Sequence, residues 1–206
     1  MKLYVDIETI PGETMPELSE IKAPANYKDP EKILAYQKEN QLEAYKKQAL
    51  NSMEGRILCV GYCIDTGKPG VLKVNVLSGD EKELITEFER IVKTAFNEPY
   101  VFVGWNILSF DIPWLWRKAI QYNLVTLKGM IPKSNPRMVV DLMKLWAADF
   151  KDYVKMSGCA KFLNIAHSPT SGSDVYDMWR SGDVEAIKRH CREDVATLME
   201  IDGRIT

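Results

Sequence analysis

The sequence predicts an α/β protein: a mixed five-stranded sheet flanked by helices, with a helical insertion after the first strand. Short apolar segments of strand length alternate along the chain with longer amphipathic segments. The first segment alternates apolar and polar residues, as a strand with two unlike faces does. A charged stretch at about 13–54 separates this segment from the next apolar one, and this stretch is the predicted insertion.

Composition is typical of one globular domain that carries this insertion. The 206 residues are 46% hydrophobic and 27% charged, with a net charge of −2. Because the charge is nearly balanced, a nucleic acid must be gripped locally or through metal ions. No segment has the length and apolarity of a membrane span, so we expect no membrane partner and a cytoplasmic location. The cysteines are not spaced as in a zinc site, and we expect them reduced and buried: Cys59, Cys63, Cys159 and Cys191.

The first strand carries two acids on one face. Leu3, Val5 and Ile7 are predicted to face the core, which places Asp6 and Glu8 together on the opposite face. Two carboxylates about 4 Å apart repel by roughly 4 kcal/mol at an effective dielectric constant near 20. A divalent cation would make this cluster favourable. The alternative is a strand end that runs into solvent, where both acids are ordinary surface residues.

The first strand is followed by a loop, a helix and a two-stranded hairpin. Residues 13–29 are rich in proline and polar side chains and are predicted to be a loop. Residues 31–53 form a loosely amphipathic helix, whose charges either face solvent or grip a substrate. Residues 56–65 are a buried strand, and residues 71–77 are its return strand in a hairpin.

A strand-to-helix junction follows. A helix over 81–96 precedes a strand over 100–104, and the next helix begins near Asp111, with Pro113 in its first turn. Asp111 therefore stands at the carboxyl end of a strand, the edge of an open α/β sheet where sites form. A purely structural N-cap role for Asp111 is the alternative.

The last third of the chain is predicted to be mostly helical. Residues 123–136 are expected to be a loop, and Asp141 is expected to cap a helix within the apolar stretch 138–146. His167 is expected in a solvated loop. Three further helices are predicted over residues 157–166, 174–180 and 183–201.

The last of these helices carries a carboxylate on its apolar face. At about 100° per residue, Asp194 falls inside the apolar stripe, and His190 lies at its edge one turn earlier. A carboxylate in such a place costs several kcal/mol unless it is paired, protonated or bound to a metal. Pairing with His190 and binding of a metal ion are both open.

Three motifs lie in order on the expected elements: Asp6-x-Glu8-Thr9, Asn106-x-x-x-Phe110-Asp111 and His190-Cys191-x-x-Asp194. In these motifs the chain resembles the DEDD family of 3′–5′ exonucleases, which has the ribonuclease H-like fold. It is most similar to stand-alone bacterial and phage proteins related to the exonuclease domain of family B DNA polymerases. The resemblance extends over residues 3–200, and we expect a free-standing nuclease.

The resemblance implies a site for two Mg²⁺ or Mn²⁺ ions. By the family's pattern, Asp6 bridges both ions, Glu8 and Asp194 hold the one that activates water, and Asp111 supports the other. It also implies the substrate-binding residues: Ile7, Thr9, Ile10, Asn106 and Phe110. Of these, Thr9 and Ile10 would border the terminal nucleotide and Asn106 would shape the site.

One position departs from the family's pattern. The family has Tyr four residues before the last Asp, or His five before it, whereas here these positions hold His190 and Arg189. A histidine can still orient or deprotonate the attacking water, so His190 is a candidate catalytic residue. Pairing with Asp194 as a structural partner is its alternative role.

The implied activity is metal-dependent hydrolysis of phosphodiester bonds from the 3′ end of single-stranded nucleic acid, DNA more than RNA. Replication or repair proteins are the expected protein partners. Three alternatives remain. The first is a nucleic-acid-binding module of the same fold with weak or lost catalysis, and the second is an exonuclease of RNA or oligonucleotides. The third is a structural protein whose acids are incidental.

Overall fold

The computed structural model describes residues 1–95, 100–130, 138–148 and 151–206. The described chain separates into two units, Met1–Glu8 with Ile57–Thr206, and Thr9–Arg56. The second unit includes the predicted insertion at about 13–54, and the assignment of the whole chain to one domain stays a prediction. Among the described helices, none is long and apolar enough to cross a membrane.

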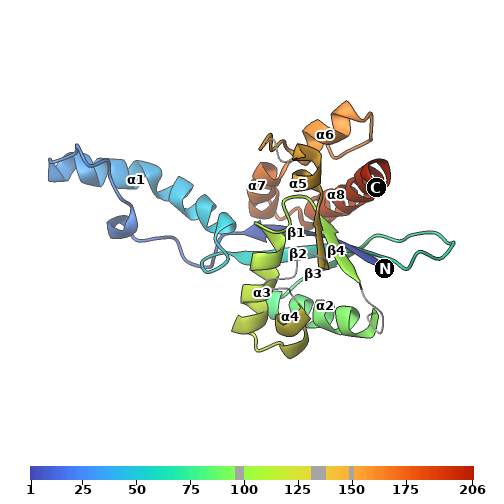
Figure 1. Ribbon diagram of the computed structural model, residues 1–206. Helices are drawn as coiled ribbons and strands as arrows, with labels where there is room; N and C mark the ends of the chain where they lie inside the picture. The colour runs from blue at the N-terminus through green and yellow to red at the C-terminus, as the bar shows by residue number, and fades with distance from the viewer. Residues whose placement is uncertain (96–99, 131–137, 149–150) are drawn as a thin grey trace. The chain divides into compact units, whose positions relative to one another are not determined.

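The first unit contains a five-stranded mixed sheet in the order β3-β2-β1-β4-β5 (Figure 1). β1 pairs in parallel with β4, β4 pairs in parallel with β5, and β2 pairs antiparallel with β3. The strands are β1 (Lys2–Ile10), β2 (Arg56–Asp65), β3 (Asn75–Ser78), β4 (Val101–Gly104) and β5 (Val139–Asp141). The predicted α/β class and mixed sheet are confirmed.

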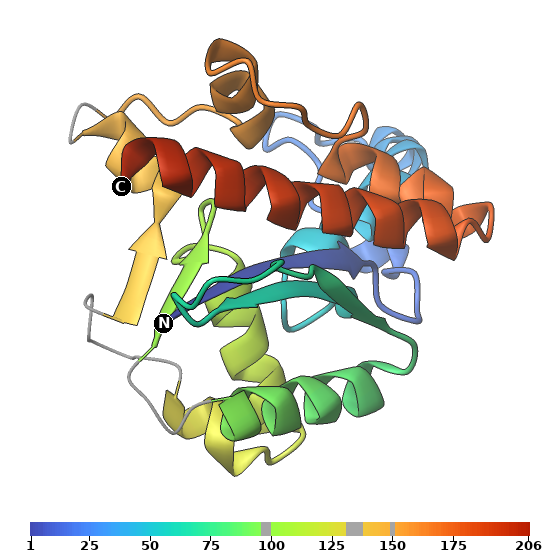
Figure 2. The same cartoon turned by 90° about the vertical axis from the view of Figure 1, so that its right-hand side faces the viewer.

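Helices cover both faces of this sheet (Figures 1 and 2). One face carries α2 (Glu81–Ala95), α3 (Asp111–Gln121) and α4 (Val125–Met130). The other carries α5 (Leu142–Ala147), α6 (Met156–Phe162), α7 (Val175–Arg180) and α8 (Val184–Ile205). Each face has its own apolar cluster: Leu3, Val5 and Ile7 of β1 belong to the first and Tyr4 to the second. The predicted division of β1 into two faces is therefore confirmed.

The first strand and the last helix are joined by a buried carboxylate. Tyr4 Oη and Lys2 Nζ each donate to Asp202 Oδ2 at 2.6 Å, and Asp202 is almost fully buried on α8. A buried charge is tolerated when it is paired and hydrogen-bonded in this way. This contact fixes the last turns of α8 against the start of β1.

The second unit is a helix with a folded-back leading segment. Its main helix is α1 (Pro30–Lys47), which begins at the N-cap Asp29 and continues into a 3-10 turn, η2 (Gln48–Leu50). Tyr45 Oη donates to the carbonyl of Gly12, and Gln48 Oε1 accepts from the Gly12 N–H. The predicted helix over 31–53 is confirmed over most of its length, and its last residues lie beyond the 3-10 turn.

Three predicted elements were wrong in detail. The helix predicted over 157–166 ends at Phe162, with Leu163 as its C-cap. The loop predicted at 123–136 contains α4, because Leu127 is buried in the core and its N–H is capped by Glu89 of α2. The rest of that loop lies largely outside the described residues. The return strand predicted at 71–77 begins only at Asn75, since pairing with β2 stops at Tyr62 and Val71 is exposed to solvent.

The four cysteines follow the prediction. Each is buried and free of any disulfide: Cys59, Cys63, Cys159 and Cys191.

Candidate functional site

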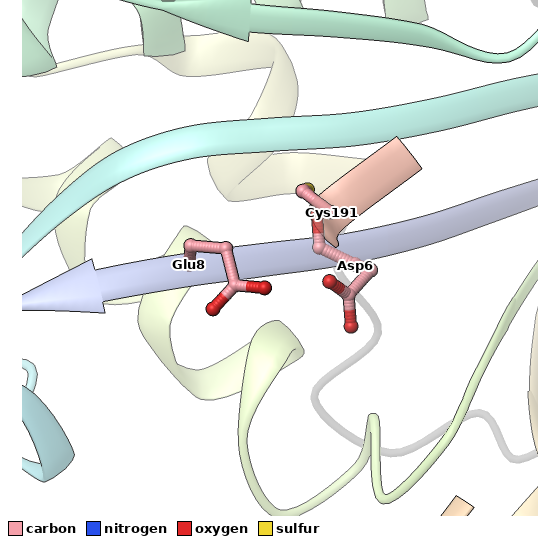
Figure 3. A group of neighbouring side chains, drawn as sticks. All are labelled: Asp6, Glu8 and Cys191. Atoms are coloured by element: carbon pink, nitrogen blue, oxygen red, sulfur yellow. Dashed lines mark hydrogen bonds between the residues drawn. The ribbon is translucent and has the colours of Figure 1, made fainter. Parts of the chain in front are cut away.

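The two acids of β1 project from the same side of the strand (Figure 3). Glu8 is buried, and Oδ2 of Asp6 is inaccessible to solvent without a hydrogen-bond partner in the described part of the chain. The alternative in which both are ordinary surface acids is therefore wrong. A buried carboxylate oxygen without a partner is costly, and a bound cation would offset that cost.

α8 brings two more polar side chains to these acids. Nε2 of His190 lies 3.3 Å from Oε1 of Glu8, and Nδ1 of His190 lies 3.6 Å from Oδ1 of Asp194. The ligand atoms of Glu8, His190 and Asp194 all lie within 4.8 Å of one another. His190 is only 3% exposed, so the residue predicted at the edge of the apolar stripe lies inside it.

A glycine allows α8 to come this close to the sheet. A Cβ atom added to Gly61 of β2 would lie 2.7 Å from Cys191 Sγ and 3.1 Å from the Cys191 carbonyl oxygen. Because Cys191 follows His190 directly, the space left by Gly61 sets the distance between His190 and the acids of β1. Gly61 stands within an apolar strand, where an isolated glycine often marks such a close approach.

Asp111 joins the group through the backbone. It is the first residue of α3 and is buried, and its Oδ1 accepts from the N–H of Ile7 at 3.1 Å. Phe110 occupies the N-cap position, so the purely capping role for Asp111 is wrong. Ile7 lies between Asp6 and Glu8, and this hydrogen bond therefore fixes Asp111 beside the two acids of β1.

Burial raises the pKa of each acid in the group, and neighbouring carboxylates of the group add to this at Asp6 and Glu8. Burial raises the pKa of Asp6 well above its ordinary value, and the charges of Glu8, Asp111 and Asp194 raise it further. Burial also raises the pKa of Glu8 well above its ordinary value, with added contributions from Cys59, Asp194 and Asp111. Without a cation, this group therefore retains protons that isolated acids would lose.

The pKa values of Asp194 and Asp111 are raised as well, with burial as the main cause of both shifts. Burial raises the pKa of Asp194 to about 7, helped by Glu193. Burial raises the pKa of Asp111 to about 7 as well, although the N–H groups of Asp111 and Ile7 oppose that rise. Burial lowers the pKa of His190, against the charges of Glu193 and Asp174, so the imidazole is neutral at pH 7.

The loop between β4 and α3 leads directly into Asp111, and Asp141 holds this loop through hydrogen bonds. Asp141 is the N-cap of α5, as predicted, and accepts from Met143 and Lys144. It also accepts from the N–H groups of Asn106 and Leu108, a second role that the sequence prediction missed. Asn106 adopts a left-handed backbone with φ of 55°, a conformation that asparagine tolerates better than most residues.

The predicted substrate-binding residues occupy different surroundings. Ile7 is buried in the core beneath the acids, and Phe110 is half-buried with its ring against Trp114. Thr9 and Ile10 belong to the second unit, where Thr9 Oγ1 donates to the Ala49 carbonyl and Ile10 is buried. Contact of any of these residues with a nucleotide stays a prediction.

Cys191 was predicted only as a reduced core cysteine within the last motif, and the structure brings it to the site. Its Sγ lies within 4.8 Å of the ligand atoms of Asp6 and Glu8, and it donates to the Asp6 carbonyl at 3.6 Å. A hydrogen bond with Cys59 and burial raise the pKa of Cys191 well above its ordinary value. The thiol therefore stays protonated and packs beneath the acids. Its position next to His190 was the only signal available in the sequence.

The donor set fits divalent cations that prefer oxygen. Three carboxylates, those of Asp6, Glu8 and Asp194, converge with one neutral imidazole, and the nearby thiol is protonated. Asp111 adds a fourth carboxylate close enough for its charge to raise the pKa of Asp6. Carboxylate oxygens suit Mg²⁺ and Mn²⁺, whereas Zn²⁺ sites favour Cys and His. Oδ2 of Asp6, which has no partner among the described residues, lies within this group and would gain one from a bound cation.

Comparison with known proteins agrees with this fold. A DNA polymerase of Archaeoglobus fulgidus is 29% identical over 133 residues, which are 58% of this chain and 17% of the polymerase. The match thus spans less than a fifth of that protein's length. A model of the RNase_H superfamily matches residues 47–206, a range that includes Asp111, His190 and Asp194 and begins after β1. The chain therefore belongs to the RNase H superfamily.

Proposed function

We propose that this protein is a Mg²⁺- or Mn²⁺-dependent 3′–5′ exonuclease that removes nucleotides from the 3′ end of single-stranded DNA. The observation that carries the proposal is the convergence of Asp6, Glu8 and Asp194 from β1 and α8, with a buried Asp6 oxygen that has no partner among the described residues. Membership of the RNase H superfamily supports a nuclease. The similarity to a DNA polymerase supports DNA as the substrate.

The four acids have distinct places in this proposal. Asp6 would contact both ions, Glu8 and Asp194 would hold one of them, and Asp111 would support the other. Ions bound there would neutralise charge on the scissile phosphate and favour ionisation of the attacking water. The hydrogen bond from Ile7 to Asp111 keeps one carboxylate oriented before substrate arrives.

His190 is proposed to position the attacking water and to accept its proton. When Glu8 is ionised, the contact at 3.3 Å favours a hydrogen on Nε2 of His190, which leaves the lone pair on Nδ1. Nδ1 has no hydrogen-bond partner in the described part of the chain. Because burial lowers the pKa of His190, the imidazole is in its basic form at neutral pH.

A second candidate function is a nucleic-acid-binding module with weak or lost catalysis. The observation that favours it is that His190 stands where the resembled family has Tyr. Its prediction is simple: the oligonucleotide binds, the metal binds, and no product forms.

Hydrolysis of end-labelled oligonucleotides tests the proposal. Single-stranded DNA and RNA of the same sequence, labelled at the 5′ or the 3′ end, are incubated with Mg²⁺, with Mn²⁺ or with EDTA. A 3′–5′ exonuclease converts the 5′ label into a ladder and releases the 3′ label at once as a mononucleotide. Asp6→Asn should abolish both patterns, and Glu83→Gln on the opposite face of the sheet serves as the charge-matched control. Internal cleavage, or release of the 5′ label first, would contradict the proposal.

A further inference from the structure

Outside the candidate site, α6 and residues 151–155, which precede it, expose aromatic side chains. Phe162 is 73% exposed and Tyr153 is 56% exposed. The ring of Phe162 also meets Trp146 of α5 edge to face, with centroids 5.6 Å apart. Together with the exposed Lys144, Lys155 and Lys161, these residues define the α5–α6 surface.

The charge of this surface is positive on balance. Residues 142–162 contain four lysines and two aspartates, in a chain whose net charge is −2. Within the described ranges, Lys144, Lys155 and Lys161 have no ion pair, whereas Lys2, Lys118 and Lys188 each pair with an acid. The ammonium groups of the α5–α6 surface are therefore available to an anionic partner.

The α5–α6 surface is tied to the loop that leads into Asp111. Trp105 Nε1 donates to the Val154 carbonyl at 3.1 Å, in the segment just before α6. Asp141, the N-cap of α5, accepts from Asn106 of the same loop. Both helices lie on the face of the sheet that α8 covers (Figures 1 and 2). A flexible chain that enters the site therefore has a fixed protein surface to follow.

Lysines interleaved with exposed aromatic rings suit single-stranded nucleic acid. Lysines neutralise the phosphates, and bases stack on aromatic side chains without regard to sequence. We propose that the α5–α6 surface binds the nucleotides of a single strand that precede its 3′ end, while the end itself occupies the site of Asp6 and Glu8. This inference rests on the proposed exonuclease function and adds the path of the substrate beyond the reacting bond.

Binding measured without catalysis tests the α5–α6 surface. Fluorescence anisotropy of 5′-fluorescein-dT20 is followed in EDTA, so that no strand is cut, over a range of salt concentrations. The triple variant K144A/K155A/K161A should bind at least tenfold more weakly at low salt. Since each neutralised phosphate contributes about 0.7 to the slope of log K against log salt for single strands, the slope should fall by about 2. Lys68, Lys82 and Lys93 lie outside the surface, and their triple alanine variant is the charge-matched control.

Aromatic variants separate stacking from charge. Phe162→Ala should weaken dT20 binding at least fivefold, the lower end of what stacking of one base contributes, and Phe162→Trp should restore it. With Mn²⁺ present, the lysine triple variant should raise KM for dT20 and leave kcat and the hydrolysis of a trinucleotide unchanged. Circular dichroism should show all variants folded.

Each result of these binding experiments either supports or overturns the inference. Selective loss of dT20 binding in K144A/K155A/K161A supports the inference, even if the wild type hydrolyses nothing and the exonuclease proposal itself fails. Equal loss in the control triple variant would show a general charge effect and overturn it. Unchanged binding in both triple variants would also overturn it, and would leave a protein partner as the occupant of the α5–α6 surface.

Discussion

Nε2 of His190 lies 3.3 Å from Oε1 of Glu8, and both side chains are buried. The sequence placed His190 one turn before Asp194 and left its partner open. The structure adds Glu8, from the other end of the chain, as a second neighbour of the same imidazole. His190 therefore links the acid of α8 to an acid of β1, and its removal tests whether this link serves catalysis or packing.

Replacement of His190 by alanine is expected to lower turnover at least about tenfold, because a positioned proton acceptor typically contributes 10²–10⁴ in rate. His190→Tyr should retain more activity than His190→Ala, since it restores the residue that the resembled family has at this spacing. The pKa of His190 is lowered by burial, so wild-type activity should fall as the pH drops through a value below 6.5. His190→Ala should lack that part of the pH profile. Normal turnover of His190→Ala, or loss of its folded state with Mn²⁺ present, would make His190 a packing residue.

Asp6→Ala is expected to abolish hydrolysis and leave the protein folded. The substitution removes the acid proposed to contact both ions and also relieves its repulsion with three other carboxylates. In EDTA, the melting temperature of Asp6→Ala should therefore equal or exceed that of the wild type. Retention of more than a few per cent of activity with Mn²⁺ would exclude the proposed role of Asp6.

Mn²⁺ is expected to stabilise the wild type, because a ligand that binds only the folded state raises the free energy of unfolding. At a concentration one hundred times its dissociation constant, this stabilisation is about 2.7 kcal/mol. The double variant Asp6→Ala, Asp194→Ala should show little shift in melting temperature with Mn²⁺. If wild type and double variant shift equally, the ion binds elsewhere.

Stability in EDTA is expected to fall as the pH rises from 5 to 8. The pKa of Asp194 is raised to about 7, above the value near 3.9 of an unfolded aspartate. The folded state thus binds the proton more tightly than the unfolded state. The resulting stabilisation is complete below pH 4 and is lost as the pH rises through 7, at up to about 1.4 kcal/mol per pH unit for one group.

Thermal melts at several pH values test this prediction. Asp194→Asn should flatten the decline, and Asp177→Asn, at an exposed position of α7, should not. Saturating Mn²⁺ should remove the decline in the wild type, because a bound cation holds the carboxylates ionised. A wild-type melting temperature independent of pH in EDTA would contradict the raised pKa values.

Much of the fold could be predicted because the patterns are local. The alternation in β1, the apolar run of β2 and the stripe of α8 each fix an element and its buried face. α4 could not be predicted, since a side chain of α2 caps it and the core buries Leu127. The shortening of β3 likewise depends on where pairing with Tyr62 stops, which is a property of two segments together.

In the candidate site, too, features set by local sequence could be predicted, and features set by contacts between distant elements could not. Asp6, Glu8 and Asp194 could be recognised as candidate site acids because each sits at a defined position in a periodic element. The contact between His190 and Glu8 could not, because it depends on how closely α8 approaches the sheet. Gly61 permits that approach, and a glycine in a strand does not say which helix passes over it. The second role of Asp141 was hidden by its evident role as a cap.

The hydrogen bond between Tyr4 and Asp202 joins residues that are 198 positions apart. The same two elements, β1 and α8, carry Asp6, Glu8 and Asp194. At a synthesis rate of about 5–20 residues per second, β1 leaves the ribosome about 10–40 s before α8. Throughout that interval the growing chain has Asp6 and Glu8 but neither His190 nor Asp194. A polypeptide whose translation stops before α8 therefore has no assembled site, and under the proposed function it cannot degrade nucleic acid while it is being made.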